Sequence, residues 1–178
     1  MNLPFLEYYY KRKIKKLKKR LLFCGEKVYI HPSVQICDAK LVSIGNNCHF
    51  QMNCKLFGCG GGIEIGDGTI LSHDIQIFAR NHNYNSEDLH FLPYDERDIC
   101  KKVTIGKNVW IGARSTILPG VKIGDGAVIG AASVVTKDVP SCAVVCGNPA
   151  KIVKYRNKNI YDRLVSSNKS YIRYKIYE

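Results

Sequence analysis

The sequence lacks several features that would assign it to other classes of protein. It has no run of about 18 apolar residues, so no helix is expected to span a membrane. The basic residues near its start follow the apolar ones and no apolar segment comes after them, so no signal peptide is expected. None of its eight cysteines belongs to a C-x-x-C pair, and no disulfide framework is expected. These absences favour the reducing cytoplasm, including the inner face of its membrane.

What the sequence does have is a six-residue repeat. Between Ile105 and Val139 it can be written IGKNVW, IGARST, ILPGVK, IGDGAV, IGAASV and VTKDV. An aliphatic residue opens every unit, a small or apolar residue stands four positions later, and glycine follows the first residue in four of the six units. An α-helix does not have this period, and a β-sandwich has no reason to keep it. The repeat predicts an all-β solenoid, a single-stranded parallel β-helix with coils of roughly 18 residues whose aliphatic side chains fill a narrow prism.

The same pattern predicts the domain organisation. Residues 28–154 are expected to form the β-helix, with a phase slip between Ile36 and Ile44 and an excursion at 83–102 that has no aliphatic register. Residues 1–27 form an N-terminal basic helical segment, and residues 155–178 a C-terminal cap in which a short helix packs on the last coil. Cys48 and Cys54 fall on inward small-residue positions and are expected to be buried as small hydrophobic side chains.

The net charge of +12 is concentrated near the start of the chain. Residues 11–20, KRKIKKLKKR, carry eight basic and no acidic side chains, with apolar residues at helical spacing. Three interpretations stay open: a solvated helix that caps one end of the solenoid, peripheral contact with an anionic membrane surface, or nucleic-acid binding. The rest of the chain does not support the last, so no nucleic-acid partner is expected.

The excursion marks a candidate site, because insertions at the corners of a solenoid often carry function. It leaves directly after Asn81 and His82. The repeat places His82 at the last position of its unit, at a corner, with its side chain directed away from the packed interior.

The repeats, the excursion after Asn-His and the run VTIGKNVWIGARSTILPGVKIGDGAVIGAASVVTKDVPSCAVVCGNPAKIVK resemble the hexapeptide-repeat O-acyltransferases, and within them the maltose/galactoside acetyltransferase-like branch. The resemblance covers residues 28–156. It implies a left-handed parallel β-helix that assembles as a homotrimer with active sites between subunits. It also implies acetyl-CoA as acyl donor and a sugar or glycan precursor as acceptor.

The resemblance identifies His82 as the catalytic base, because the histidine of the family stands 17 residues after the isoleucine of an Ile-Gly pair, as His82 does after Ile65. A neutral imidazole is suited to remove the proton of an attacking hydroxyl. The second ring nitrogen needs a backbone carbonyl or an acid, and the excursion offers five acids between which the sequence does not choose: Glu87, Asp88, Asp95, Glu96 and Asp98.

The resemblance also implies the residues of the two substrate sites. For coenzyme A it indicates Gly112, Ala113, Gly130 and Ala131 along the pantetheine groove, with Thr136, Lys137 and Lys154 near the phosphates. For the acceptor it indicates Asn53, Asn81, Asn83 and Tyr84. Trp110 is expected on the coil surface, at a subunit or cofactor contact. The run GCGGG at 58–62 departs from the family, which tends to have acidic acceptor-binding residues there, so the acceptor is expected to differ from maltose and galactosides.

Three other functions remain as alternatives. A zinc carbonic anhydrase shares this fold and needs three histidines from stacked coil edges. His31 and His49 are 18 residues apart, but the phase slip before Ile44 spoils their stacking, and no metal site is expected. Serine acetyltransferase usually has a long helical N-terminal domain, which this sequence does not show. A non-catalytic binding solenoid would release no thiol from acetyl-CoA.

Overall fold

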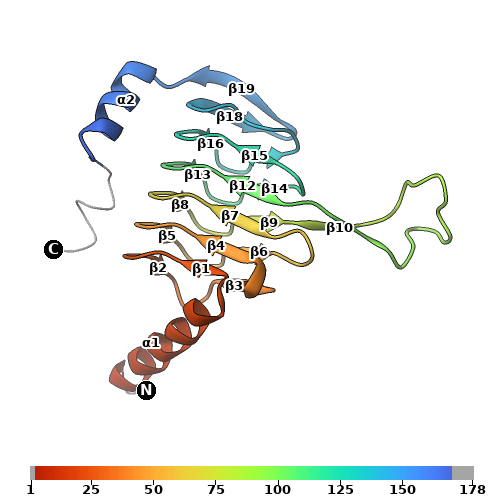
Figure 1. Ribbon diagram of the computed structural model, residues 1–178, viewed down its shortest axis with the longest axis horizontal. Coiled ribbons are helices and arrows are strands. Elements are labelled where there is room, and N and C mark those ends of the chain that lie inside the picture. Colours follow the sequence, from red (N-terminus) through yellow and green to blue (C-terminus); the bar gives the residue numbers. More distant parts are fainter. Residues whose placement is uncertain (1–2, 170–178) are drawn as a thin grey trace.

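The chain forms a left-handed parallel β-helix with one long arm, as Figure 1 shows. The computed structural model describes residues 3–169. The fold class predicted from the repeat is confirmed. The parts of the predicted terminal segments at 1–2 and 170–178 lie outside the described residues.

Three parallel sheets form the faces of the prism, and the chain visits them in the order A, B, C. Sheet A contains β1 (Phe23–Cys24), β4 (Val42–Ile44), β7 (Ile63–Ile65), β12 (Val103–Ile105) and β15 (Lys122–Ile123). Sheet B contains β2 (Tyr29–Ile30), β5 (His49–Phe50), β8 (Ile70–Leu71), β13 (Trp110–Ile111), β16 (Val128–Ile129) and β18 (Ala143–Gly147), with β19 (Ala150–Tyr155) added antiparallel to β18. Sheet C contains β3 (Gln35–Cys37), β6 (Lys55–Phe57), β9 (Gln76–Phe78), β14 (Thr116–Ile117) and β17 (Val134–Val135).

The core is the column of inward side chains that the repeat predicts. In sheet A, Ile44, Ile65 and Ile105 are partners in successive strands, and each is at most 2% exposed. Cys48 and Cys54 are fully buried, and each thiol donates to a carbonyl of the next coil. Burial raises the pKa of Cys48 to about 12 and that of Cys54 to about 11, so both are protonated small hydrophobic groups.

Two irregularities have local causes. The phase slip before Ile44 is a 3-10 turn, η1 (Ala39–Leu41), which lies between sheets C and A. The parallel pairing begins at Phe23, whose strand β1 pairs with β4, so the first coil starts before the predicted boundary at Val28.

The two helices lie at opposite ends of the solenoid, and among the described residues neither is long and apolar enough to cross a membrane. Helix α1 (Leu3–Arg20) packs Ile14 and Leu17 against the first coil, while its N-terminal half projects beyond it. Helix α2 (Lys158–Ser166) was predicted to pack its apolar residues on the last coil. Instead it has no buried residue, and Ile160, Leu164 and Val165 remain 39–49% exposed. The reversal through β19 carries α2 outside the prism, where the Tyr161 ring lies against Gly126.

Candidate active site

The arm leaves the solenoid at the corner between sheets C and A, here called the C–A corner. Strands β10 (Arg80–His82) and β11 (Asp98–Cys100) form an antiparallel hairpin that continues into it (Figure 1). The predicted position of His82 is therefore corrected: it does not end a coil unit but lies just outside the C–A corner, in the first strand of the arm. The last inward residue of the coil is Ala79, and from Arg80 onward the chain pairs with the returning strand rather than with the next coil.

His82 has two neighbours in the arm. Its ring stacks on Tyr94, with centroids 4.1 Å apart and planes 10° from parallel. Its Nδ1 lies 3.6 Å from Oδ1 of Asp98, the residue opposite it in the hairpin. The other oxygen of Asp98 accepts from Arg80 Nη1 at 3.0 Å. The imidazole is half exposed.

Of the five acids in the excursion, the structure thus brings only Asp98 to His82. Glu96 lies beside His90, at 3.6 Å. Asp88 and Asp95 both receive hydrogen bonds from Arg97, which holds the pKa of each at about 2, well below its usual range. These ion pairs shape the distal part of the arm and leave Asp98 as the carboxylate beside His82.

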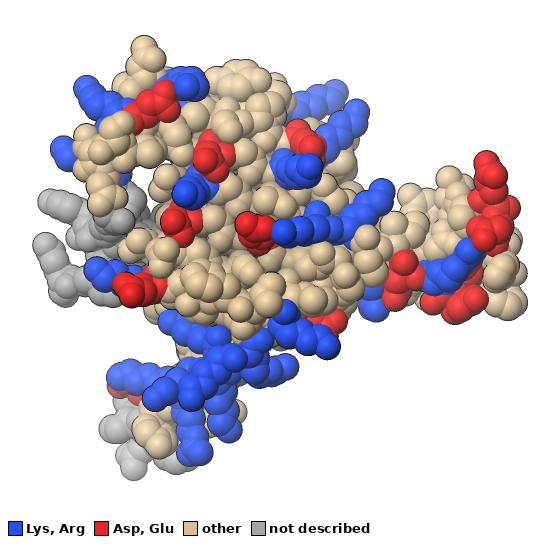
Figure 2. Space-filling view, in the orientation of Figure 1, with Lys and Arg blue, Asp and Glu red and all other residues tan. Residues whose placement is uncertain are grey.

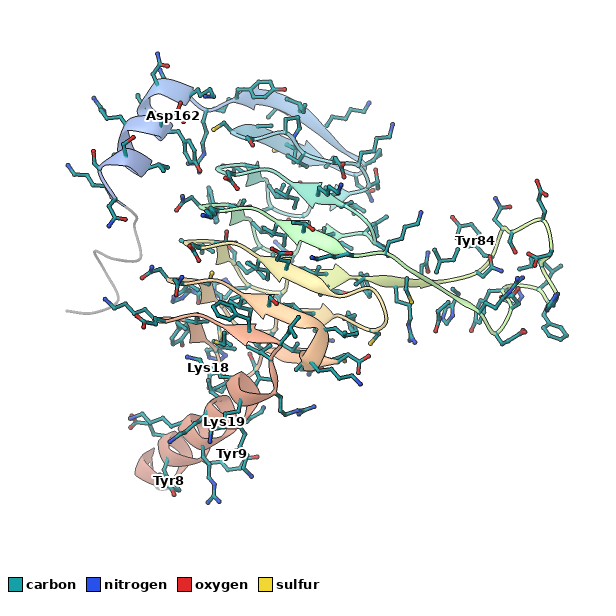
Figure 3. The ribbon with its side chains drawn as sticks, viewed as in Figure 1. Tyr8, Tyr9, Lys18, Lys19, Tyr84 and Asp162 are labelled. Carbon is teal, nitrogen blue, oxygen red and sulfur yellow. The ribbon has the colours of Figure 1, made fainter. Side chains whose placement is uncertain are left out.

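The side chain of Asn83 does not face solvent, so it is not placed to contact an acceptor as predicted. It is 4% exposed, and its amide group donates to Ser86 and to the buried carboxylate of Asp95. Its backbone also pairs with Asp95 and Arg97 across the arm. Asn83 therefore holds the arm together. The neighbouring Asn81 and Tyr84 are exposed, and Figure 3 shows Tyr84 on the arm, away from the solenoid.

The glycine-rich run at 58–62 lies under the base of the arm. A Cβ on Gly61 would come 2.2 Å from the carbonyl oxygen of Ala79, and one on Gly60 would come 2.3 Å from Sγ of Cys100. Gly60 also has φ +70°, which side chains rarely adopt. The two strands of the arm pass so close to this corner that larger residues than glycine would clash at 60 and 61. Packing therefore explains why GCGGG departs from the family pattern.

The small residues predicted for the donor groove gather at a different corner, between sheets B and C. Gly112 and Gly130 occupy equivalent positions on successive coils, and each donates its N–H to a carbonyl of the coil that follows. A Cβ on Gly112 would lie 2.7 Å from the nitrogen of Ala131, and one on Gly130 would lie 2.4 Å from Sγ of Cys146. At this B–C corner the surface, called here the donor wall, carries few bulky side chains, so the backbone is accessible. Cys146, which the sequence analysis did not single out, lies next to Gly130 and extends this surface.

Asn53 also lies at the B–C corner, three coils before Gly130. It adopts φ 61°, like Asp74 and Arg114 at the equivalent turns, and its amide donates to Oδ1 of Asp74 at 3.1 Å. Strands β6 and β9 are parallel neighbours in sheet C. Asn53 comes just before β6 and His82 follows β9, so the two residues lie at opposite ends of these strands. Within one chain, the structure does not bring Asn53 to the base.

The three predicted phosphate contacts are exposed but not together. Thr136 and Lys137 follow β17 at the C–A corner, on the same side as the arm. Lys154 lies on β19 opposite Val144, at the outer edge of sheet B. Trp110 is half exposed on sheet B, where its indole donates to Ser72 at 3.2 Å.

The described residues offer the zinc alternative no ligand set, since no three His, Cys, Asp or Glu side chains gather in residues 3–169. His31 contacts Ser33, and His49 stacks on Tyr29 while its Nε2 contacts Gln51.

Comparisons with known proteins agree with the fold. The bacterial transferase hexapeptide family (six repeats) matches residues 102–137. The chain is 31% identical to the galactoside O-acetyltransferase of Escherichia coli K12 over 148 residues, which cover 82% of this chain and 70% of that protein. A maltose O-acetyltransferase from Clostridium difficile 630 superposes with a TM-score of 0.73 at 32% identity, over 82% of this chain and 75% of its own.

A second similar solved structure contains a bound ligand. It is a hexapeptide-repeat acetyltransferase from Vibrio cholerae O1 biovar eltor, complexed with acetyl-coenzyme A. It superposes with a TM-score of 0.73 at 29% identity, over 82% of this chain and 76% of its own. The repeat and the relatives lead to one conclusion: the chain belongs to the hexapeptide-repeat acetyltransferases and is an acyltransferase.

Proposed function

We propose that this protein transfers the acetyl group of acetyl-CoA to a hydroxyl of a sugar or glycan precursor, with His82 as general base. The observation that carries the proposal is the setting of His82, stacked on Tyr94, beside Asp98 and half exposed on the arm. Nε2 accepts the proton of the attacking hydroxyl, and the carboxylate of Asp98 stabilises the imidazolium that forms. Arg80 keeps Asp98 in place through its ion pair.

The B–C corner fits the pantetheine arm of coenzyme A. Pantetheine is narrow and amide-bearing, and the wall made by Gly112, Ala113, Gly130 and Ala131 has few side chains to keep it from the backbone. Lys137 and Lys154 supply cations for the phosphates, and Thr136 a hydroxyl. The bound donor contributes a thioester carbonyl for attack. The acceptor contacts that remain are Asn81 and Tyr84, which flank the base, and Asn53, from the B–C corner.

The active form is a homotrimer in which one subunit provides the base and its neighbour the donor groove. Strand β14 and its flanks cross sheet C from Ala113 to Leu118, a span of about 16 Å at the usual rise of a strand. The base and the donor wall therefore stand apart in one chain, at opposite edges of sheet C. The arm also presents Phe91 and Leu92 at 65% and 86% exposure, apolar surface that suits contact with a second subunit.

A cytoplasmic location accords with the cysteines, all eight of which are free thiols. The proposal predicts a protein that needs no disulfide and keeps its activity in a reducing buffer.

The test is release of free thiol from acetyl-CoA in the presence of a panel of sugars, nucleotide-sugars and amino sugars. We expect release that depends on a hydroxylated acceptor and an acetylated product that mass spectrometry identifies as an ester. Acetylation of amino sugars alone would replace the O-acetyl assignment with N-acetylation. Absence of release with every acceptor would support a non-catalytic solenoid. Molar mass by light scattering tests the trimer separately.

A further inference from the structure

Helix α1 is fixed to the solenoid through one of its sides. Ile14 and Leu17 pack against the first coil, and the chain then enters the coil at Leu21, which is 9% exposed. Two lysines on the same side form hydrogen bonds with the first coil. Lys13 Nζ donates to the carbonyl of Pro32 at 2.9 Å, and Lys18 Nζ donates to the carbonyl of Val28. These contacts give the opposite side of α1 a defined orientation, away from the solenoid.

That side and the adjoining flank of α1 carry a continuous basic surface, and Lys11, Lys15 and Lys19 on the flank also border the groove between α1 and the first coil. Tyr8, Arg12, Lys15 and Lys19 follow one another at spacings of four, three and four residues, which places them on one stripe of a helix. They line a shallow groove together with Lys11 and Lys16. We call these six residues the basic stripe. Tyr8 and the adjacent Tyr9 are 63% and 55% exposed, and Figure 3 shows both on the projecting part of α1.

The charge of the basic stripe is not balanced within the described part of the chain. The one acidic side chain of α1 is Glu7, which pairs with Lys11 at 2.7 Å. In residues 3–169 no acidic group lies within ion-pair distance of Arg12, Lys15, Lys16 or Lys19. Figure 2 shows Lys and Arg gathered over α1, whereas Asp and Glu gather toward the far end of the arm.

This arrangement has a cost for the helix. Arg12 and Lys16, and likewise Lys15 and Lys19, are four residues apart, and like charges at that spacing repel. A polyanionic partner offsets this repulsion. Tyrosine rings, which have an apolar face and a polar hydroxyl, are exposed at the end of the same helix. The partner must therefore offer apolar as well as polar contacts. A bilayer surface with anionic headgroups has both properties, since phosphates lie at the depth where tyrosine is favoured.

We propose that the basic stripe docks this enzyme on an anionic phospholipid surface, with Arg12, Lys15, Lys16 and Lys19 against the headgroups and Tyr8 and Tyr9 at the interface. The helix lies on the bilayer and does not cross it. The interaction is independent of the proposed transferase chemistry, because the basic stripe shares no residue with the arm or the B–C corner. It brings the enzyme to acceptors that are attached to, or made at, a membrane.

The test is co-sedimentation with vesicles, measured without substrates. Vesicles of phosphatidylcholine with about one third phosphatidylserine are expected to bind the protein at low salt and release it as salt rises, and pure phosphatidylcholine to bind it at least ~10-fold more weakly. The variant Arg12→Gln/Lys15→Gln/Lys16→Gln/Lys19→Gln removes four cations that each contribute about fivefold, so its affinity should fall ~100-fold or more.

A matched control removes the same charge elsewhere: Lys55→Gln/Lys107→Gln/Lys122→Gln/Lys151→Gln changes four exposed lysines of the solenoid. It should keep at least about half of the binding if position matters more than net charge. Circular dichroism checks that both variants fold. Equal loss in both variants, or equal binding to neutral vesicles, would overturn the proposal. Tighter binding to a duplex DNA or RNA oligonucleotide at the same salt would reassign the basic stripe to nucleic acid.

Discussion

Two corners of the solenoid are built in opposite ways. At the B–C corner the repeat is uninterrupted, and glycine and alanine on successive coils leave a bare wall. At the C–A corner the repeat breaks, and an arm rich in charged and aromatic side chains leaves the prism with His82 at its base. The regular corner exposes backbone along a narrow wall of small residues. The irregular corner carries His82, which we propose as the base. On that proposal one corner supplies the base and the other the donor wall, so neither corner of one chain makes a complete site.

The largest expected effect is at the irregular corner. Replacement His82→Ala removes the base and should lower kcat by ~100-fold or more, with KM for acetyl-CoA nearly unchanged. His90→Ala is the matched control, since His90 is also on the arm and lies 3.6 Å from a carboxylate, that of Glu96. If both variants lost activity equally, the role of His82 would be structural.

A change at the regular corner should act on the donor instead. Ala131 is exposed, so Ala131→Trp can fold while its ring fills the groove. We expect KM for acetyl-CoA to rise about 30-fold, as for a loss of ~2 kcal/mol of binding, with a smaller change in kcat. Lys107→Trp, on an exposed turn of another corner, controls for an added indole. An unchanged KM would remove the B–C corner from the donor site.

The neighbour of the base should matter less than the base itself. Asp98→Asn keeps the size of the side chain but removes the charge that faces Nδ1 of His82 and the ion pair with Arg80. We expect kcat to fall about 10-fold, because the imidazolium that forms during the reaction loses a stabilising charge. Glu96→Gln, which changes an acid beside His90, should leave kcat nearly unchanged.

The smallest effect on activity at neutral pH concerns the distal arm. Arg97 holds the pKa values of Asp88 and Asp95 at about 2, so the folded arm favours their ionised forms. Their contribution to stability is complete above about pH 4, the usual range of an aspartate, and is lost as the pH falls toward 2. Hydrogen exchange should therefore show the arm opening at acid pH while the solenoid stays protected. Asp95→Asn should open the arm at pH 7 and weaken this pH dependence, and Glu87→Gln should not.

The regular part of the molecule was predictable because each side chain repeats a local rule. An aliphatic residue every six positions identifies the inward column, and so the burial of Ile105, Ile117 and even Cys48 follows from counting. The stacking of Gly112 and Gly130 follows in the same way, since one coil separates them, whereas their proposed role at the donor rests on the resemblance to the family.

The arm was less predictable because its contacts depend on the pairing of two strands across a long excursion. Nothing periodic relates His82 to Tyr94 or to Asp98, so the sequence marked the histidine but left its partners open. Asn83 was misassigned for the same reason: adjacency to the base suggested the acceptor, whereas the hairpin turns this side chain inward to Asp95. Helix α2 was placed on the last coil because its apolar spacing was read without the reversal at β19.

The division of the site between two subunits is tested most directly by mixing two variants that are each strongly impaired when acetyl-CoA is kept well below the raised KM. His82→Ala subunits retain the donor wall, and Ala131→Trp subunits retain the base. If each site takes its base from one subunit and its wall from the next, co-refolding the two at equal amounts should restore about a quarter of the wild-type sites. Activity no greater than the sum of the two separate variants, in trimers shown to be mixed, would contradict the account.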